Sequence, residues 1–182
     1  MRLAVLLFLL FGFGIANGQV AEMNQVRPGK IGISIYYMDT LLNIGSNKLN
    51  VYVNDQTEEI VIRLNPSSLR TGIDSLDQKL RDGFMNEVVF KGSFGLSKLW
   101  ETGQLPRSFE MEGEMTIEGI TSSISMNGSV QQSQQGMGIN GLLYLHFDPE
   151  LHAFGLDEKL PEFADFGCVE ILQPISIANS RQ

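Results

Sequence analysis

The sequence is poor in cysteine and in basic residues, and each shortage excludes a class of structure or partner. One cysteine, Cys168, occurs in 182 residues, so no disulfide within the chain can stabilise the fold. The 13 Lys and Arg residues are outnumbered by 21 Asp and Glu, which gives a net charge of -8. No basic stripe is present. We therefore expect neither nucleic acid nor an anionic membrane surface as a partner.

Histidine is equally scarce, with only His146 and His152. A structural metal needs three or four converging ligands, and the sequence shows no Cys/His cluster that could supply them. We therefore expect no metal site and no cofactor. No nucleophile-elbow motif frames a serine and no Gly-rich phosphate fingerprint is complete, so we do not expect an enzyme. A hydrolase or isomerase that pairs one of the histidines with a carboxylate remains an alternative.

Long apolar runs are also lacking, and the one at the N-terminus is too short to span a bilayer comfortably. Arg2 precedes an apolar run at residues 3–13, and residues 16–18 are small. This pattern predicts a secretory signal peptide over residues 1–18, cleaved near Gly18 and Gln19; an uncleaved anchor is the alternative. Cleavage removes Arg2 and leaves 12 basic against 21 acidic residues (13 minus one). We expect a periplasmic or secreted protein with no stable membrane insertion.

The rest of the chain has the length of one domain with a core. Residues 19–29 are polar and predict a flexible lead-in, residues 30–175 carry the periodic segments, and residues 176–182 form a polar tail. Apolar and polar residues alternate as strands require in most of these segments. The expected strands cover residues 31–37, 49–53, 59–64, 109–119, 124–130, 139–147 and 169–172.

The alternation is strictest over residues 109–119, where small or apolar residues alternate with polar ones. Its four glutamates could form a calcium-binding edge, but residues two apart on a strand do not converge on one ion without a neighbouring strand. We expect a solvated face instead. The glutamates are Glu110, Glu112, Glu114 and Glu118.

One helix is expected near residue 75. Ile73, Leu76 and Leu80 recur at three- and four-residue intervals, and Asp74 or Ser75 could cap the first turn. So short a helix is stable only when it docks on an apolar surface.

About eight strands with one early helix predict an all-β protein, a single antiparallel eight-stranded barrel with one short helix. Such a barrel is either filled by its own side chains or hollow enough for one small ligand, and periodicity does not distinguish the two. Met111, Met115 and Met126 fall on the apolar faces of adjacent strands, where methionine can line an adaptable cavity but also fills ordinary cores. Cys168 is expected to be a small buried residue of the last strand.

Three blocks in this order resemble the YceI-like family, exported lipocalin-like proteins that enclose an isoprenoid chain. The first joins residues 65–72 to the helix at 76–85, the second is the G-x-M-T-I-x-G-x-T hairpin at 113–121, and the third covers residues 147–156 before the closing strand. Residues 30–48 show no match to the family's opening strand.

This resemblance implies an extended, lipocalin-like barrel with the helix packed against one end and an amphiphilic lipid, an isoprenoid quinone or a fatty chain, inside. The alternative is a filled barrel that acts through its outer surface as a periplasmic interaction or stress-accessory module. The oligomeric state stays open, a homodimer included. The expected ligand-lining residues are Ile60, Ile62, Leu64, Phe90, Phe94, Met111, Met115, Ile117, Met126, Leu143 and Leu145.

Overall fold

The computed structural model describes residues 24–25, 28–54, 57–93, 95, 107–133 and 139–177. The expected signal peptide at residues 1–18 lies outside this part of the chain, as do residues 178–182 of the expected tail. Asn24–Gln25 of the expected lead-in forms a short strand, and the last strand runs on to Ile177. The helices of the described residues include none with the length and hydropathy that a bilayer span requires.

The described residues form nine strands and three helical segments. The helical segments are η1 (Pro66–Ser68), α2 (Asp74–Arg81) and η2 (Leu151–Phe154). The strands are β1 (Asn24–Gln25), β2 (Gly29–Tyr37), β3 (Thr40–Asn54), β4 (Glu59–Leu64), β5 (Val88–Ser93), β6 (Arg107–Ile117), β7 (Ile120–Ser133), β8 (Ile139–Phe147) and β9 (Phe163–Ile177).

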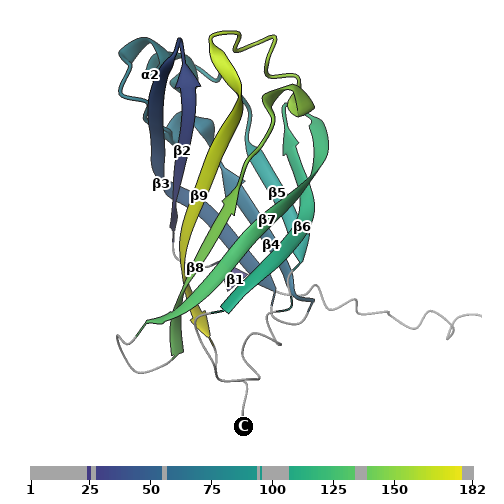
Figure 1. The fold of residues 1–182 in the computed structure, drawn as a ribbon. Helices are drawn as coiled ribbons and strands as arrows, with labels where there is room; N and C mark the ends of the chain where they lie inside the picture. Colours follow the sequence, from purple (N-terminus) through teal and green to yellow (C-terminus); the bar gives the residue numbers. More distant parts are fainter. Residues whose placement is uncertain are drawn as a thin grey trace, which may run out of the picture.

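Strands β2 to β9 form a closed antiparallel barrel of eight strands (Figure 1). The hydrogen-bonded order is β3-β2-β9-β8-β7-β6-β5-β4, and the pairing of β3 with β4 closes the ring. The two-residue β1 pairs with the C-terminal part of β3, at Tyr52 and Val53. Closure leaves none of the eight strands with a free edge that could pair with another molecule. The expected all-β, eight-stranded antiparallel barrel with one short α-helix is confirmed.

Strict alternation in β6 places one face in the core and the other in water. Met111 and Met115 are buried, whereas Glu110, Glu112 and Glu114 are exposed, as the pattern predicted. The exposed glutamates stand on the outer wall of the barrel, where Lys91 of β5 lies opposite Glu114. The same alternation in the other strands lines the interior with apolar side chains.

The expected strand boundaries were wrong for β3, β7 and β9, which are longer than the sequence pattern indicated. β6 ends at Ile117 and not at residue 119, and β5 was not predicted as a strand. β3 begins at Thr40 because a tight turn at Met38 and Asp39 folds it directly back onto β2. Both turn residues have positive φ, 44° and 64°, a conformation that favours glycine, asparagine and aspartate. Asp39 fits this preference but Met38 does not, so the sequence carries only a weak signal for this hairpin. β9 begins at Phe163, where it pairs with Tyr37 of β2.

Helix α2 lies at one end of the barrel (Figure 1), and the segment between β8 and β9 lies at that same end. Its expected caps were wrong: the N-cap is Ile73, which makes no side-chain capping bond. Leu76 is buried and Leu80 packs against the core, so the apolar stripe of the helix faces the barrel interior. We call this the helix end and the opposite one the far end.

Candidate functional site

An apolar cavity of about 180 Å³ occupies the helix end of the barrel. The strands supply its wall, and α2, η2 and the segments beside them supply its cover. The wall is lined by Ile31, Ile33, Ile35, Ile44, Leu49, Ile62, Leu64, Val88, Phe90, Met115, Ile117, Met126, Phe147, Gly167, Val169 and Ile171. The cover includes Leu76, Leu80, Phe84, Met85, Leu151, Phe154, Leu156 and Leu160.

The lining contains only two polar side chains, Thr71 and Lys79. The Thr71 hydroxyl is already engaged, because it donates to Asp77 Oδ1 at 2.8 Å and accepts from the Ile73 N–H at 3.0 Å. Lys79 is exposed on α2, so its ammonium stands at the mouth of the cavity and not inside it. Such a cavity can bury an apolar chain, and it offers no group that could transfer a proton or stabilise a charge deep inside.

Phe90 forms part of the cavity floor. Its side chain is 2% exposed and lies against two glycines of the inner wall, Gly92 and Gly113. A Cβ on Gly113 would come within 2.5 Å of Phe90 Cζ, so only glycine leaves room for the ring. Phe109 makes a similar close approach to Gly128 nearer the far end.

Beyond this floor the barrel is filled by its own side chains. Met111, Val130, Leu143 and Leu145 are at most 1% exposed, and none of them lines the cavity. The barrel is thus hollow at the helix end and packed at the far end. The sequence left a filled and a hollow barrel open, and this molecule combines the two.

The structure divides the expected ligand-lining residues into three groups. Four of them, Ile60, Met111, Leu143 and Leu145, point inward but belong to the packed far end and do not line the cavity. Phe94 lies outside the described residues. The remaining six line the cavity: Ile62, Leu64, Phe90, Met115, Ile117 and Met126.

Several other groups of lining residues were missed by sequence reasoning. Ile31, Ile33 and Ile35 alternate with other residues along β2, and this alternation could have identified them as inward-facing. The apolar stripe of α2 could have identified Leu76 and Leu80 in the same way. The lining residues near η2 had no such signal, because a short 3-10 segment between two strands shows no periodicity.

A buried carboxylate holds α2 over the cavity. The Thr71 N–H and hydroxyl both donate to Asp77 Oδ1, at 2.7 and 2.8 Å. These bonds, backbone first, lower the pKa of Asp77 from its ordinary value, and Arg70 and Arg81 lower it further. Asp77 lies in the first turn of the helix, where a negative charge also meets the positive end of the helix dipole.

Glu118, at the turn between β6 and β7, connects two further segments at the helix end. Its carboxylate accepts a 2.5 Å hydrogen bond from the Asn86 N–H and a 2.9 Å bond from Lys159 Nζ. The Asn86 bond is the main cause that lowers the pKa of Glu118, followed by the Lys159 bond. The carboxylate therefore fastens the loop after α2 and the segment after η2 to the barrel wall.

His152 anchors η2 in the same way. Its backbone N–H donates to Asp165 Oδ1 at 2.9 Å, its ring Nδ1 lies 2.6 Å from Asp165 Oδ2, and its Nε2 lies 3.3 Å from Glu150 Oε2. The hydrogen bond to Asp165 raises the pKa of His152, and the same contacts lower the pKa of Asp165. Neither His152 nor His146 lines the cavity, so the histidine-based hydrolase or isomerase arrangement has no support from this cleft.

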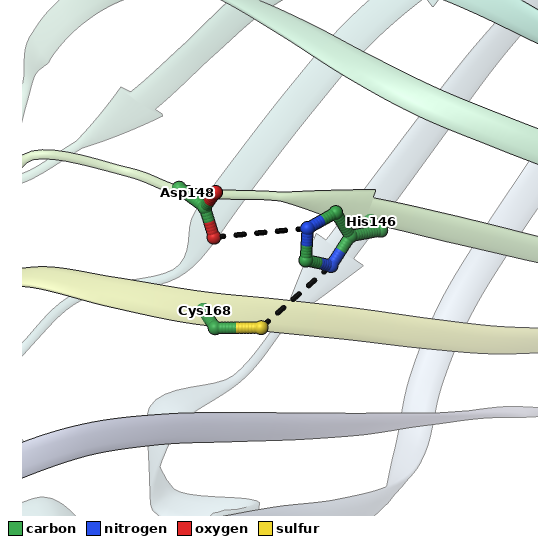
Figure 2. A group of neighbouring side chains, drawn as sticks. All are labelled: His146, Asp148 and Cys168. Carbon is green, nitrogen blue, oxygen red and sulfur yellow. Dashed lines mark hydrogen bonds and ion pairs between the residues drawn. The ribbon is translucent and has the colours of Figure 1, made fainter.

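A fourth polar group lies on the outer wall, where Figure 2 shows His146, Asp148 and Cys168 side by side. The Cys168 thiol is 3.6 Å from His146 Nδ1, and His146 Nε2 is 3.8 Å from Asp148 Oδ1. The expectation of a buried cysteine was wrong: Cys168 is half-buried and lies on the outer face of β9. Partial burial, followed by the charges of Asp148 and Glu170, raises the pKa of its thiol.

Sequence reasoning did not show that one histidine and the cysteine lie beside a carboxylate. His146, Asp148 and Cys168 each offer a metal-ligand atom, and these atoms lie within 4.8 Å of one another. The signal was present as His-x-Asp on β8 and Cys-x-Glu on β9, two spacings that put side chains on one face of a strand. These spacings predict a shared site only when it is known that β8 and β9 are paired.

No protein-family model and no curated protein matches the sequence. Among solved structures, the chain is similar to a polyisoprenoid binding domain from Saccharophagus degradans implicated in plant cell wall breakdown. The TM-score is 0.69 at 10% identity, over 86% of this chain and 100% of that one. It is also similar to Burkholderia cenocepacia BcnA, with a TM-score of 0.58 at 13% identity over 81% of this chain and 96% of that one. At such identities the likeness establishes the fold. The chain therefore has the fold of a polyisoprenoid binding domain, the YceI-like barrel that its motifs resemble.

Proposed function

We propose that this protein is exported and that it holds an amphiphilic, lipid-like molecule, an isoprenoid or fatty chain, in the cavity at the helix end. The signal-peptide pattern at residues 1–18 supports export to the periplasm or the medium. The likeness to a solved polyisoprenoid binding domain supports the class of ligand. The protein acts in this proposal as a carrier or store and catalyses no reaction.

The observation that carries the proposal is the chemical uniformity of the cavity. Every lining side chain except Thr71 and Lys79 is apolar, and Lys79 stands at the mouth. Burying each methylene of a ligand there gains about 0.8 kcal/mol. About ten methylenes gain about 8 kcal/mol, from which the cost of immobilising a flexible chain is subtracted.

The size of the cavity limits how a long ligand can be bound. Its volume of about 180 Å³ is below the ~300–1,000 Å³ of pockets that enclose drug-sized ligands. A long chain therefore enters only when the cover of α2 and η2 moves outward, or when part of the chain stays in the mouth. The small volume and the packed far end favour the second candidate function, an interaction or stress-accessory module that holds no ligand.

Native mass spectrometry distinguishes the two candidates. The protein is purified from its own envelope or medium without detergent, and its mass is measured intact and again after organic extraction. We expect a stoichiometric adduct that extraction releases as an apolar chain, on a polypeptide that begins at Gln19. An apo mass, with no uptake of added quinones or fatty acids, would favour the interaction module.

A matched pair of variants locates the ligand. Val169 of β9 lines the cavity, whereas Leu172 of the same strand is 40% exposed on the outer wall. Val169→Phe fills part of the cavity and is expected to weaken ligand uptake at least about tenfold, a loss of about 1.4 kcal/mol of binding free energy. Leu172→Phe adds the same ring outside and is expected to leave uptake unchanged. Equal uptake by both variants would place the ligand elsewhere.

A further inference from the structure

The outer wall of the barrel carries a group of side chains that the lipid-binding proposal does not use. β8 and β9 are antiparallel neighbours in which His146 pairs with Glu170 and Phe147 pairs with Val169. Phe147 and Val169 point into the barrel, so the residues on either side of them point outward. Pairing of these two strands thus brings His146, Asp148 and Cys168 to one outer patch (Figure 2).

The spacing of these side chains suits a metal ion. With metal–sulfur and metal–nitrogen bonds of about 2.3 and 2.0 Å, a tetrahedral zinc site separates a thiolate sulfur from an imidazole nitrogen by about 3.5 Å. The observed distance from Cys168 Sγ to His146 Nδ1 is 3.6 Å. Asp148 is exposed directly after β8, and its carboxylate lies 3.8 Å from the other ring nitrogen, His146 Nε2. To complete the third position, this free-standing carboxylate would turn toward the Nδ1 side of the ring, where all the ligand atoms already lie within 4.8 Å of one another.

We propose that His146, Asp148 and Cys168 form a binding site for a divalent transition-metal ion of the borderline type, such as Zn²⁺. Thiolate, imidazole and carboxylate together are a donor set that such ions favour over the hard ions Ca²⁺ and Mg²⁺. Three protein ligands leave a fourth position for water. This site is separate from the lipid cavity, which none of the three residues lines.

Two carboxylates lie beside the sulfur on the outer wall. Asp148 has an oxygen within 4.8 Å of it, and Glu170 is an exposed residue of β9 that pairs with His146 of β8. Glu170 is also held by the Tyr144 hydroxyl, which donates to its Oε1 at 2.7 Å, and this bond keeps the carboxylate beside the patch as an outer-sphere group. A divalent cation would offset these negative charges, and a bound metal deprotonates the thiol that ligates it.

The same three residues could instead be a nucleophilic cysteine with its histidine. That arrangement requires neighbours that stabilise a free thiolate, such as cationic groups or a helix N-terminus. The neighbours of Cys168 here are the carboxylates of Asp148 and Glu170. The sulfur also lies outside both the apolar cavity and the polar hollow on the outer wall of β3 to β6. Metal binding therefore fits the patch better than catalysis by the free thiol.

Cobalt absorption tests the site directly. Co²⁺ is added to the untagged, reduced protein at neutral pH, and the thiolate-to-cobalt charge-transfer band is followed in the near ultraviolet. Because Cys168 is the only cysteine in the chain, any such band reports on this residue. We expect the band to saturate at one Co²⁺ per chain and to disappear when Zn²⁺ is added. No band in the presence of excess Co²⁺ would overturn the proposal.

Variants then identify the other ligands. Cys168→Ser is expected to abolish the band, and His146→Gln and Asp148→Asn are expected to weaken Co²⁺ binding at least about tenfold. His152→Gln is the matched control, because His152 also lies between two carboxylates but has no cysteine beside it. All four positions lie at the surface or half-buried, so circular dichroism should show an intact barrel in each variant. Binding that persists in Cys168→Ser, or that falls equally in His152→Gln, would overturn the proposal.

Discussion

The two ends of the barrel are made from the same eight strands, yet one is hollow and the other is packed. At the helix end the inward side chains line a cavity of about 180 Å³, which α2 and η2 cover. At the far end the inward side chains, such as Met111, Leu143 and Leu145, are at most 1% exposed and do not line this cavity, and Gly128 lies against the ring of Phe109. We therefore expect the packed end to contribute more to the stability of the barrel and the hollow end to be the one that binds.

The largest expected effect comes from truncating one leucine at each end. Leu145 of the far end and Leu49 of the cavity wall are both 0% exposed. Leu145→Ala leaves a new void and should cost about 3–5 kcal/mol of unfolding free energy, whereas Leu49→Ala enlarges an existing cavity and should cost about 2 kcal/mol. Urea unfolding of both variants measures the difference. Equal losses would mean that the two ends are packed alike.

Adding a methyl group at the boundary between the ends should cost somewhat less. Gly113→Ala places a Cβ close to the Lys91 carbonyl oxygen and 2.5 Å from Phe90 Cζ, so both the β5 backbone and the ring must shift, at an expected cost of about 1–3 kcal/mol. Gly32→Ala is the control, because its Cβ would meet nothing within 4 Å on the outer wall. Thermal unfolding should show a lower midpoint for Gly113→Ala alone. An unchanged midpoint would mean that Phe90 and the adjoining β5 backbone can move without loss of stability.

A smaller effect is expected from the hydrogen bonds that hold the cover. Asp77→Asn keeps an acceptor oxygen for Thr71 but removes its charge, which should cost about 1 kcal/mol. Asp74→Asn is the control, since Asp74 is an exposed residue of the same helical turn. Amide hydrogen exchange should show faster opening of α2 in Asp77→Asn and no change in the far-end strands. Faster exchange throughout the barrel would contradict a local role.

The smallest expected effect is a pH dependence confined to the helix end. The pKa of His152 is raised by Asp165, so this contact stabilises the fold fully below pH ~6.5 and loses that effect as pH rises through the raised value. The pKa of Asp165 is lowered, so its contribution is present above pH ~3.9 and is lost as pH falls through the lowered value. NMR titration should give His152 a pKa above the ordinary histidine value and show shifts in η2. His152→Gln should abolish them.

Particular residues show which features could be predicted from the sequence alone. The strict alternation around Met111 and Met115 determined which side of β6 faces inward, because a strand has only two faces. The hairpin at Met38 and Asp39 was not predicted, since Met38 is a residue type that rarely adopts the positive φ required there and only Asp39 carried a turn signal. Alternation also assigned Met111 and Met115 the same role. Only the structure shows that Met115 lines the cavity and Met111 fills the core.

The sequence by itself determined the fold class, the inward face of most strands and the presence of one docking helix, because these depend on local periodicity. Tertiary structure alone decided how deep each inward side chain lies, which end is hollow, and which polar groups meet. Depth depends on strand register and on the side chains across the axis, such as Phe90 over Gly113. The meeting of His146 and Asp148 with Cys168 depends on the pairing of two strands. Neither is a property of a local stretch of sequence.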